Sequence, residues 1–235
     1  MTLIDVRHSP AAVSVDALAR QWARQEAARP GAAYVVDTEI SARRRGGVLW
    51  SHPDSTAVGV IVRPELLAID AADLLWLAAG LGAADALGAL TGATSRCRWP
   101  DGVEMDIDSP PDVAITAVYE LGPGRIEYAV LVVRVAPSLA LGGRSALSDA
   151  LVHSLRSAMS LLDDPTALLQ TYRDQCVTLG QSVSASLLPH GVARGVADTI
   201  DERGALVLRS ATGLTDSVAI SALRDLRPVD ASHMH

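Results

Sequence analysis

The segment that decides the fold lies near the C-terminus, where Thr171 to Leu187 reads TYRDQCVTLGQSVSASL and Gly191 to Leu208 reads GVARGVADTIDERGALVL. Beyond Cys176 the apolar residues alternate with small and polar ones over short runs, which predicts strands. The sequence from residue 201 to 204, DERG, is typical of a tight turn between two strands. We therefore expect a small β-barrel of SH3-like size over residues 177–228. Its predicted strands are Ser182–Leu187, Gly191–Ile200, Ala205–Arg209 and Asp216–Ile220.

The residues before this segment alternate between helical and strand patterns, which indicates an α+β domain. Ser14 or Asp16 is expected to cap the first helix. If the run 125–135 is an exposed final strand, it allows pairing across a homodimer. The predicted helices are residues 17–28, 71–90, 145–162 and 165–175, and the predicted strands are residues 32–37, 57–62, 115–120 and 125–135.

The composition of the 235-residue chain argues against several function classes. Aromatic residues make up 3% of the chain and the net charge is -7. Few rings are therefore available to stack on bases, and the charge opposes attraction to phosphate backbones, so nucleic acid is not an expected partner.

Cysteine usage and the apolar runs bear on location. Cys97 and Cys176 have no CxxC spacing, so the sequence predicts neither a disulfide framework nor a zinc site, and no metal site is expected. The N-terminus lacks the apolar core of a signal peptide, and the nearest approach to a membrane span, Leu74–Leu90, is broken by Gly and Asp. We expect a cytoplasmic protein with no membrane partner, and no ligand role for the histidines of the C-terminal tail.

The C-terminal segment resembles the last domain of biotin protein ligases. In that family a Tyr-x3-Cys-x-Thr-Leu-Gly stretch leads into the barrel, and a Gly-x-Ala-x-x-Ile-Asp-x-x-Gly-x-Leu hairpin follows. Both patterns are present in order here. The matching residues are Tyr172, Cys176, Thr178, Leu179 and Gly180, then Gly195, Ala197, Ile200, Asp201, Gly204 and Leu206.

The resemblance continues upstream in weaker form. The family's ligand loop, Gly-Arg-Gly-Arg-x-Gly-Arg-x-Trp, resembles residues 42–50, which keep Arg43, Arg45, Gly47 and Trp50. The family's Lys-Trp-Pro-Asn-Asp motif resembles residues 98–102, RWPDG. The resemblance covers roughly residues 10–228. It implies a mixed-sheet, biotin/lipoate ligase-like α+β domain over residues 1–175, an SH3-like barrel over residues 176–228 and a tail over residues 229–235.

Several residues that the family uses for chemistry are replaced. Ser14-Val15-Asp16 resembles its Ser-Thr-Asn motif, and Glu39 replaces a Gln before the ligand loop. The chain has no Lys, so the catalytic-strand lysine expected near residues 113–116 is missing and Arg98 lies at the motif-lysine position. Gly102 replaces the motif aspartate. The Gly-x-Gly-x-Asn strand reads VLVVR over residues 130–134, which places Val130 and Val132 at the two glycine positions.

The family's reaction explains why these losses matter. Such ligases activate a carboxylate with ATP and pass the acyl group to a lysine of an acceptor domain. Fixed cations must offset the repulsion between the carboxylate and the α-phosphate. An arginine grips an anion bidentately, but it does not replace a compact lysine at the transfer centre.

Two functions follow as hypotheses. The first is a catalytically impaired paralogue that binds an acyl or nucleotide ligand, or a protein partner such as a biotin-carrier domain or a ligase or carboxylase subunit. The alternative is an active ligase that forms an acyl-adenylate from biotin or another carboxylic acid. Biotin, ATP and Mg²⁺ are implied by the resemblance alone.

Candidate ligand residues each have a structural alternative. Arg43 to Arg45 read equally as a solvated run. Isolated tryptophans are usually core or edge residues, Ser14 is first a helix cap, and His52 and His153 are expected to be structural. No residue is assigned a catalytic role. The candidate ligand-binding residues are Ser14, Glu39, Arg43, Arg45, Gly47, Trp50, Trp99 and Asp101, with Arg98 beside them.

Overall fold

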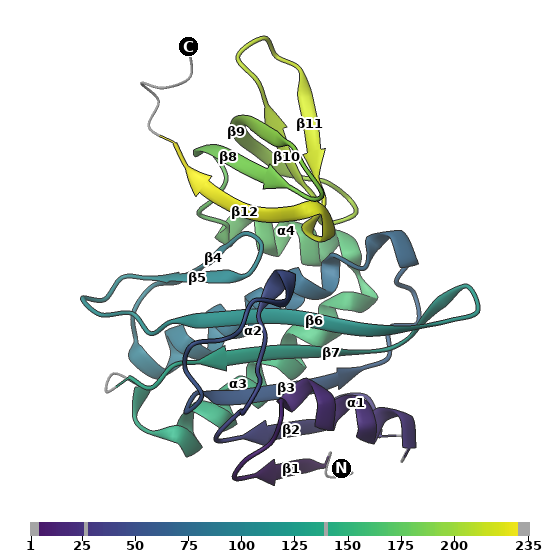
Figure 1. The fold of residues 1–235 in the computed structure, drawn as a ribbon, viewed down its shortest axis with the longest axis vertical. Coiled ribbons are helices and arrows are strands. Elements are labelled where there is room, and N and C mark those ends of the chain that lie inside the picture. The colour runs from purple at the N-terminus through teal and green to yellow at the C-terminus, as the bar shows by residue number, and fades with distance from the viewer. Residues whose placement is uncertain (1–4, 26–27, 139–140, 230–235) are drawn as a thin grey trace.

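The computed structural model describes residues 5–25, 28–138 and 141–229, and it places a small C-terminal sheet on top of a larger α+β domain (Figure 1). Apart from Val229, the tail expected over residues 229–235 lies outside the described residues, as do its two histidines.

The larger domain is built on a five-stranded mixed sheet in the order β1-β2-β3-β7-β6. Its strands are β1 (Val6–Ser9), β2 (Ala33–Val36), β3 (Thr56–Val62), β6 (Val113–Gly122) and β7 (Arg125–Val135). β1 runs parallel to β2, and the other neighbouring pairs are antiparallel. The mixed-sheet α+β class predicted from the sequence is confirmed.

The position of β7 corrects one expectation. β7 lies between β3 and β6 and pairs with both along most of its length. It is therefore a central strand, as its run of buried valines and leucine requires. The suggestion that Arg125–Val135 is an exposed strand available for pairing across a dimer was wrong.

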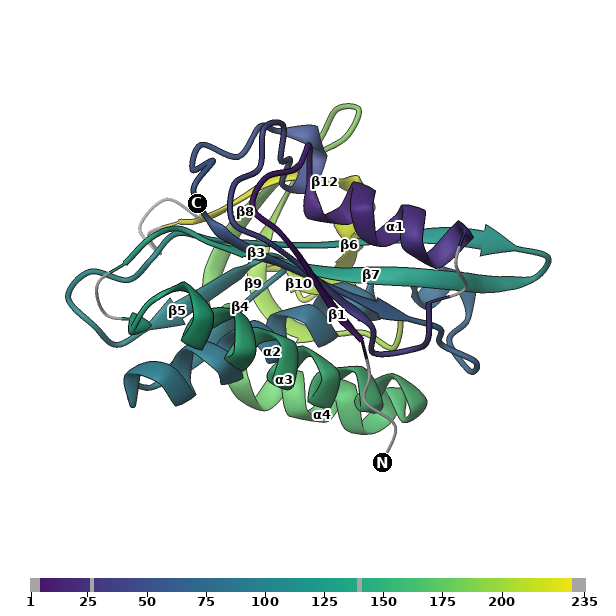
Figure 2. The same ribbon diagram turned by 90° about the horizontal axis from the view of Figure 1, so that it is seen from below.

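Helices cover the two faces of this sheet unequally. α1 (Val15–Gln25) lies on one face, and α2 (Leu74–Thr91), α3 (Arg144–Ser160) and α4 (Pro165–Gln175) lie on the other (Figure 2). Two separate apolar clusters fill these layers, a small one under α1 and a large one around α2. α2 is long and apolar enough to cross a membrane, but most of it is buried inside the domain, as expected of a core helix.

Local chemistry explains where two of the helices begin. The Ser14 hydroxyl accepts a hydrogen bond from the Ala17 backbone N–H at 3.3 Å, so Ser14 caps α1 as predicted. α4 begins with Pro165 after Asp164, whose carboxylate accepts a bond from the Ala167 N–H at 3.0 Å.

The C-terminal sheet has the order β11-β10-β9-β8-β12. Its strands are β8 (Ser182–Leu187), β9 (Val192–Ile200), β10 (Leu206–Arg209), β11 (Thr215–Val218) and β12 (Leu223–Pro228), with the short 3-10 helix η5 (Ile220–Ala222) before β12. The SH3-like unit is confirmed, but the expected barrel is not closed, because in the part of the chain described here no ladder joins β11 to β12. The sequence did not predict β12, because half of its LRDLRP residues are charged and only Leu223 is buried.

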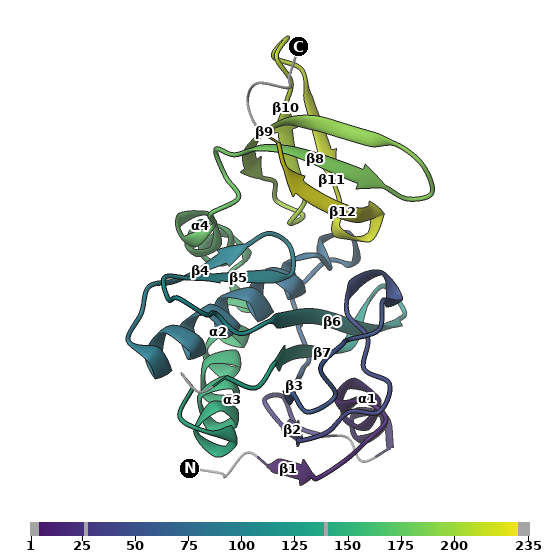
Figure 3. The same cartoon turned by 60° about the vertical axis from the view of Figure 1, so that its left-hand side comes forward.

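The C-terminal sheet is fixed to the larger domain through the ribbon of β4 (Ser95–Arg98) and β5 (Gly102–Met105) and through α2 (Figure 3). The indole N–H of Trp99 donates to the Gly204 carbonyl at 3.1 Å, and the Trp99 backbone N–H donates to the Thr178 hydroxyl at 3.0 Å. Gly204 has a φ of +91°, and a Cβ at this position would lie 3.1 Å from the Asp73 backbone. Only glycine fits there without a shift.

Candidate functional site

A fully buried arginine lies on the face of the sheet that α1 covers. Arg134 shares this face with Val130 and Val132, because alternate residues of a strand point the same way. Its side chain is 0% exposed. The guanidinium bonds Glu39 twice, from Nε to Oε2 at 2.7 Å and from Nη2 to Oε1 at 3.1 Å. It also bonds the Asp16 carboxylate at 2.7 Å.

The remaining donors of Arg134 are used as well. Nη1 donates to the Arg43 carbonyl at 3.2 Å and to the Thr116 hydroxyl at 3.3 Å. A guanidinium has five N–H donors, and these five bonds engage all of its nitrogens. Glu39 is also satisfied by the protein, since it accepts the Val15 N–H at 2.6 Å. Glu39 and Arg134 lie where the sequence resembles the ligand-binding motifs of the family, and here they bond to each other and to their protein neighbours.

Two valines fill the space beside this cluster. Val130 and Val132 are completely buried and belong to the apolar cluster under α1. A Cβ placed on Gly59 of β3 would come within 3.1 Å of the Val130 side chain and within 3.4 Å of Val15. Such distances show tight packing between α1 and the sheet. In the ligase pattern both valine positions are glycine, so this chain places two packed aliphatic side chains where the pattern has none.

Residues 42–50 form a folded loop. The Arg43 guanidinium donates to the Gly47 carbonyl at 2.6 Å, and the Trp50 N–H donates to the Ala42 carbonyl at 2.9 Å. Gly46 and Gly47 have φ values of +70° and +74°, the left-handed region that glycine adopts without strain. The Arg43 side chain is exposed, and this hydrogen bond to Gly47 lies within the loop itself.

Arg45 links this loop to the β4–β5 ribbon and to the C-terminal sheet. Its Nε bonds the Asp101 carboxylate at 3.0 Å, and its Nη1 donates to the Leu223 carbonyl at 2.5 Å. Asp101 lies in the turn between β4 and β5, and Leu223 begins β12. The guanidinium is mostly buried, so these charge-assisted bonds hold the loop, the ribbon and the C-terminal sheet together.

A cleft of about 710 Å³ opens where these three parts meet. Arg44, Arg45 and Arg98 line it from the larger domain, and Asp225 lines it from β12. Arg98 is tied to Glu104 of β5 at 2.7 Å. Arg44 is exposed, and its side chain has no hydrogen-bond or ion-pair partner among the residues that the structure describes. Within the described residues, the cleft thus offers the free guanidinium of Arg44 beside the engaged ones of Arg45 and Arg98.

Trp99 lines this cleft, but its indole ring is almost completely buried. The indole is 1% exposed and packs in the large core, with its N–H on the Gly204 carbonyl. Gly102 also lines the cleft, and a Cβ on it would lie 3.4 Å from the Arg98 side chain. Trp99 therefore packs as a core residue and joins the two domains.

Trp50 belongs to a different group of residues. Its indole N–H donates to the Ser55 hydroxyl at 2.6 Å, and its ring meets the His52 ring edge-on at 5.1 Å. The His52 imidazole bonds Asp112 at 2.8 Å. The sequence did not predict this partner because Asp112 lies 60 residues away in the chain. The group anchors the end of the loop.

The candidate residues are therefore spread over three places. Arg45, Arg98, Trp99 and Asp101 meet at the cleft, and Ser14 and Glu39 lie at the buried cluster under α1. Arg43, Gly47 and Trp50 make their contacts within the loop of residues 42–50 and at its end. Neither Arg134 nor Arg44 was among the predicted ligand residues, although for Arg134 an arginine inside a run of buried aliphatic residues was a visible signal. Across the described ranges, no three His, Cys, Asp or Glu side chains gather closely enough to hold a metal ion.

Comparison with known sequences gives one family match. The family described as "Biotin protein ligase C terminal domain" matches residues 178–225. No curated protein sequence matches the chain significantly.

Solved structures match over almost the whole chain. The biotin protein ligase of Aquifex aeolicus in complex with biotin and ATP has a TM-score of 0.74 and 16% identity, covering 97% of this chain and 100% of that one. A biotin protein ligase-like protein of unknown function from Silicibacter sp. TM1040 has a TM-score of 0.66 and 14% identity, covering 93% and 95%. The Leishmania major ligase with biotinyl-5-AMP has a TM-score of 0.59 and 16% identity, covering 93% and 100%. At identities this low, the TM-scores show a common fold and nothing further.

Proposed function

Because this chain has the fold of the biotin/lipoate ligase family, we propose that it is a ligase-like binding protein that does not adenylate biotin. The observation that carries the proposal is the buried cluster of Arg134, Glu39 and Asp16, together with Val130 and Val132. These side chains fill the sheet face where the ligase pattern has glycines and uncharged amides. Biotin does not fit this face unless the packed core opens.

Electrostatics support the same proposal. The cluster sets one guanidinium against two carboxylates, so it presents no surplus positive charge to an anionic substrate. Adenylation must bring a carboxylate and a phosphate together, which needs fixed cations at the reacting centre. All the nitrogens of Arg134 already donate to protein groups, and the chain contains no lysine that could supply a cation in its place.

We infer that the ligand site of this protein is the cleft between the two domains. Arg44 has its guanidinium free there, and Arg98 reaches the same cleft from the ribbon. Arginines of this kind hold a phosphate or carboxylate through charge-assisted bonds. The ligand we propose is thus an anionic nucleotide or acyl compound, bound without the adenylation step.

A protein partner is the second candidate. The resemblance to biotin ligases favours a biotin-carrier domain or a ligase or carboxylase subunit, and we place the protein in the cytoplasm without a nucleic-acid partner. Binding to such a subunit needs no adenylation chemistry.

A thermal-shift screen of the purified protein with ATP, ADP, biotin, lipoate and fatty acids tests the proposal, because a ligand specific for the native state raises the melting temperature. We expect ATP or ADP, or one of the acids other than biotin, to stabilise the protein, and we expect no effect of biotin. Stabilisation by biotin together with biotin-dependent ATP–pyrophosphate exchange would show that the protein is a biotin ligase. Exchange that depends on a different acid would support the alternative ligase function.

A further inference from the structure

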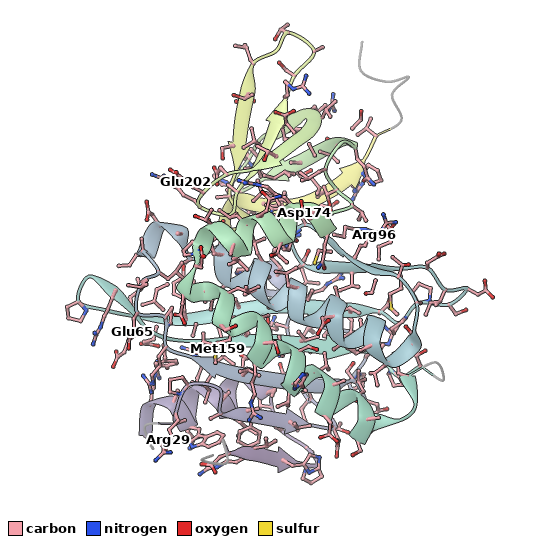
Figure 4. All side chains as sticks on the ribbon, turned by 180° about the vertical axis from the view of Figure 1, so that it is seen from behind. Arg29, Glu65, Arg96, Met159, Asp174 and Glu202 are labelled. Atoms are coloured by element: carbon pink, nitrogen blue, oxygen red, sulfur yellow. The ribbon has the colours of Figure 1, made fainter. Side chains whose placement is uncertain are left out.

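Two cysteines that are distant in the sequence lie opposite each other at the joint between the two domains. Cys97 is in β4, and Cys176 follows the last residue of α4. An isolated parallel β-bridge pairs them, and the Val177 N–H donates to the Cys97 carbonyl at 2.9 Å. Figure 4 shows α4 directly against the C-terminal strands, with Asp174 of its last turn at this junction.

The bridge sets the geometry of the pair. Directly paired residues of neighbouring strands are roughly 5 Å apart, within the range of about 4.4–6.8 Å that disulfide-bonded Cα atoms span. Their side chains leave the backbone on the same side, and both belong to the large core. Both thiols are free in this structure.

The surroundings show that the two sulfur atoms influence each other. Burial raises the pKa of the Cys97 thiol far above its usual range, and the neighbouring Cys176 raises it further. The Tyr172 hydroxyl is buried close by and has no hydrogen-bond partner in the described part of the chain. Burial and the two thiols also raise the pKa of Tyr172. These apolar surroundings thus favour the neutral form of the Cys97 thiol.

We propose that Cys97 and Cys176 form a reversible disulfide that locks the C-terminal sheet onto the larger domain. The oxidant is a small-molecule disulfide. The Cys176 thiolate, which is the more accessible of the two, attacks one sulfur atom of that disulfide and releases one thiol. The Cys97 thiolate then attacks the Cys176 sulfur and releases the second thiol. The two cysteines lose two electrons and two protons, and the small disulfide is reduced to two thiols.

The bond acts on the joint and on one wall of the cleft. Trp99 and Thr178 each lie two residues from one of the cysteines, and both line the cleft. A disulfide closing the chain between residues 97 and 176 also removes much of the freedom of the unfolded state. This inference is independent of the proposed function, because it concerns the thiol pair alone.

Oxidised glutathione is the probe for the test. The purified chain is incubated with it and then unfolded in a denaturant that contains iodoacetamide, which alkylates the remaining free thiols. The alkylated chain is digested and analysed by mass spectrometry. We expect one peptide pair joined through Cys97 and Cys176, a loss of two hydrogens from the intact mass, and a rise in Tm on the order of 10 °C that dithiothreitol reverses. Oxidation should be faster at pH 9 than at pH 7, because the raised pKa of Cys97 limits thiolate formation.

The single variants Cys97→Ser and Cys176→Ser are the matched controls. Each should show neither the mass loss nor the oxidant-dependent rise in Tm. The proposal is overturned if both cysteines of the wild-type chain, oxidised while folded, are still alkylated after unfolding. It is also overturned if the cysteines carry glutathione separately and the joined peptide does not form. An equal rise in Tm in either control would assign the effect to another cause and also overturn it.

Discussion

Arg134 and Glu39 form a two-bonded ion pair in which both side chains are completely buried, with nitrogen-to-oxygen distances of 2.7 and 3.1 Å. Glu39 precedes the loop of residues 42–50, and Arg134 lies near the end of β7. Because Arg134 also bonds the Arg43 carbonyl, the pair fixes the start of that loop to the sheet. The pair thus closes the space under α1 and holds the segment that leads to the cleft.

Removing one member of this pair should be strongly destabilising. Glu39→Ala leaves the Arg134 guanidinium buried without its main counter-charge, and we expect a loss of about 3–5 kcal/mol in the free energy of unfolding. Urea denaturation measures this loss. The control is Asp16→Asn, which removes the partly exposed carboxylate and should cost less. A loss below about 1 kcal/mol for Glu39→Ala would contradict a structural role for the pair.

Biotin adenylation should be absent. Groups that stabilise charge at such centres are each typically worth about a hundredfold or more in rate, and this chain lacks the lysines and the two glycines of the pattern. We expect no biotin-dependent ATP–pyrophosphate exchange and no labelling of a carrier domain. Exchange that clearly exceeds a blank without protein would refute this prediction.

The sequence predicted the helices and the central strands because their signals are local. Arg125–Val135 was predicted to the residue and Pro165–Gln175 closely, since a Gly-Pro-Gly turn precedes the strand and a proline occupies the first turn of the helix. β1 and β12 were not predicted. Both are short edge strands rich in polar residues, so their pairing depends on neighbours far along the chain rather than on an apolar pattern.

The site could be predicted only in part. The ligand loop and the ribbon turn were identified by their motifs, and Arg45 and Asp101 do meet. The cluster under α1 was missed because Asp16, Glu39 and Arg134 are brought together only by the packing of α1 on the sheet. The spacing of these residues along the chain does not indicate that they are in contact.

Anion binding in the cleft should depend on Arg44. Arg44→Ala removes the free guanidinium, and we expect the affinity for whichever anion the thermal screen identifies to fall by about 1.5–3 kcal/mol, the cost of one charge-assisted bond. Isothermal titration calorimetry measures it. Arg194→Ala is the control, because Arg194 is exposed on β9 and does not line the cleft. Equal affinities of Arg44→Ala and wild type would place the ligand elsewhere.

The indole of Trp99 should stabilise the joint between the domains. Trp99→Phe keeps a buried ring but leaves the Gly204 carbonyl without this donor, so we expect a loss of about 1–3 kcal/mol in the free energy of unfolding. Trp76→Phe, on α2 and only partly buried, is the control and should cost less. If the two variants lose the same stability, the interdomain bond makes no specific contribution.

Asp73 should make stability depend on pH in the opposite sense to most carboxylates. Burial raises the pKa of Asp73 above its ordinary value, and the nearby Asp201 adds to the rise, although the Ile220 N–H bond partly offsets both. Between the unfolded-state and the folded-state pKa values, the folded state therefore keeps a proton that the unfolded state has released. Stability falls as the pH rises through this window, and the loss is complete above the folded-state pKa. Asp73→Asn retains an oxygen that accepts the Ile220 N–H and carries no charge. We expect it to raise Tm at pH 7, with the gain vanishing below the unfolded-state value of about 3.9.

Thermal unfolding between pH 3 and 8 measures this difference, with the exposed Asp70→Asn as control. A gain for Asp73→Asn that stayed constant across this range would show that the charge of Asp73 is not its cause.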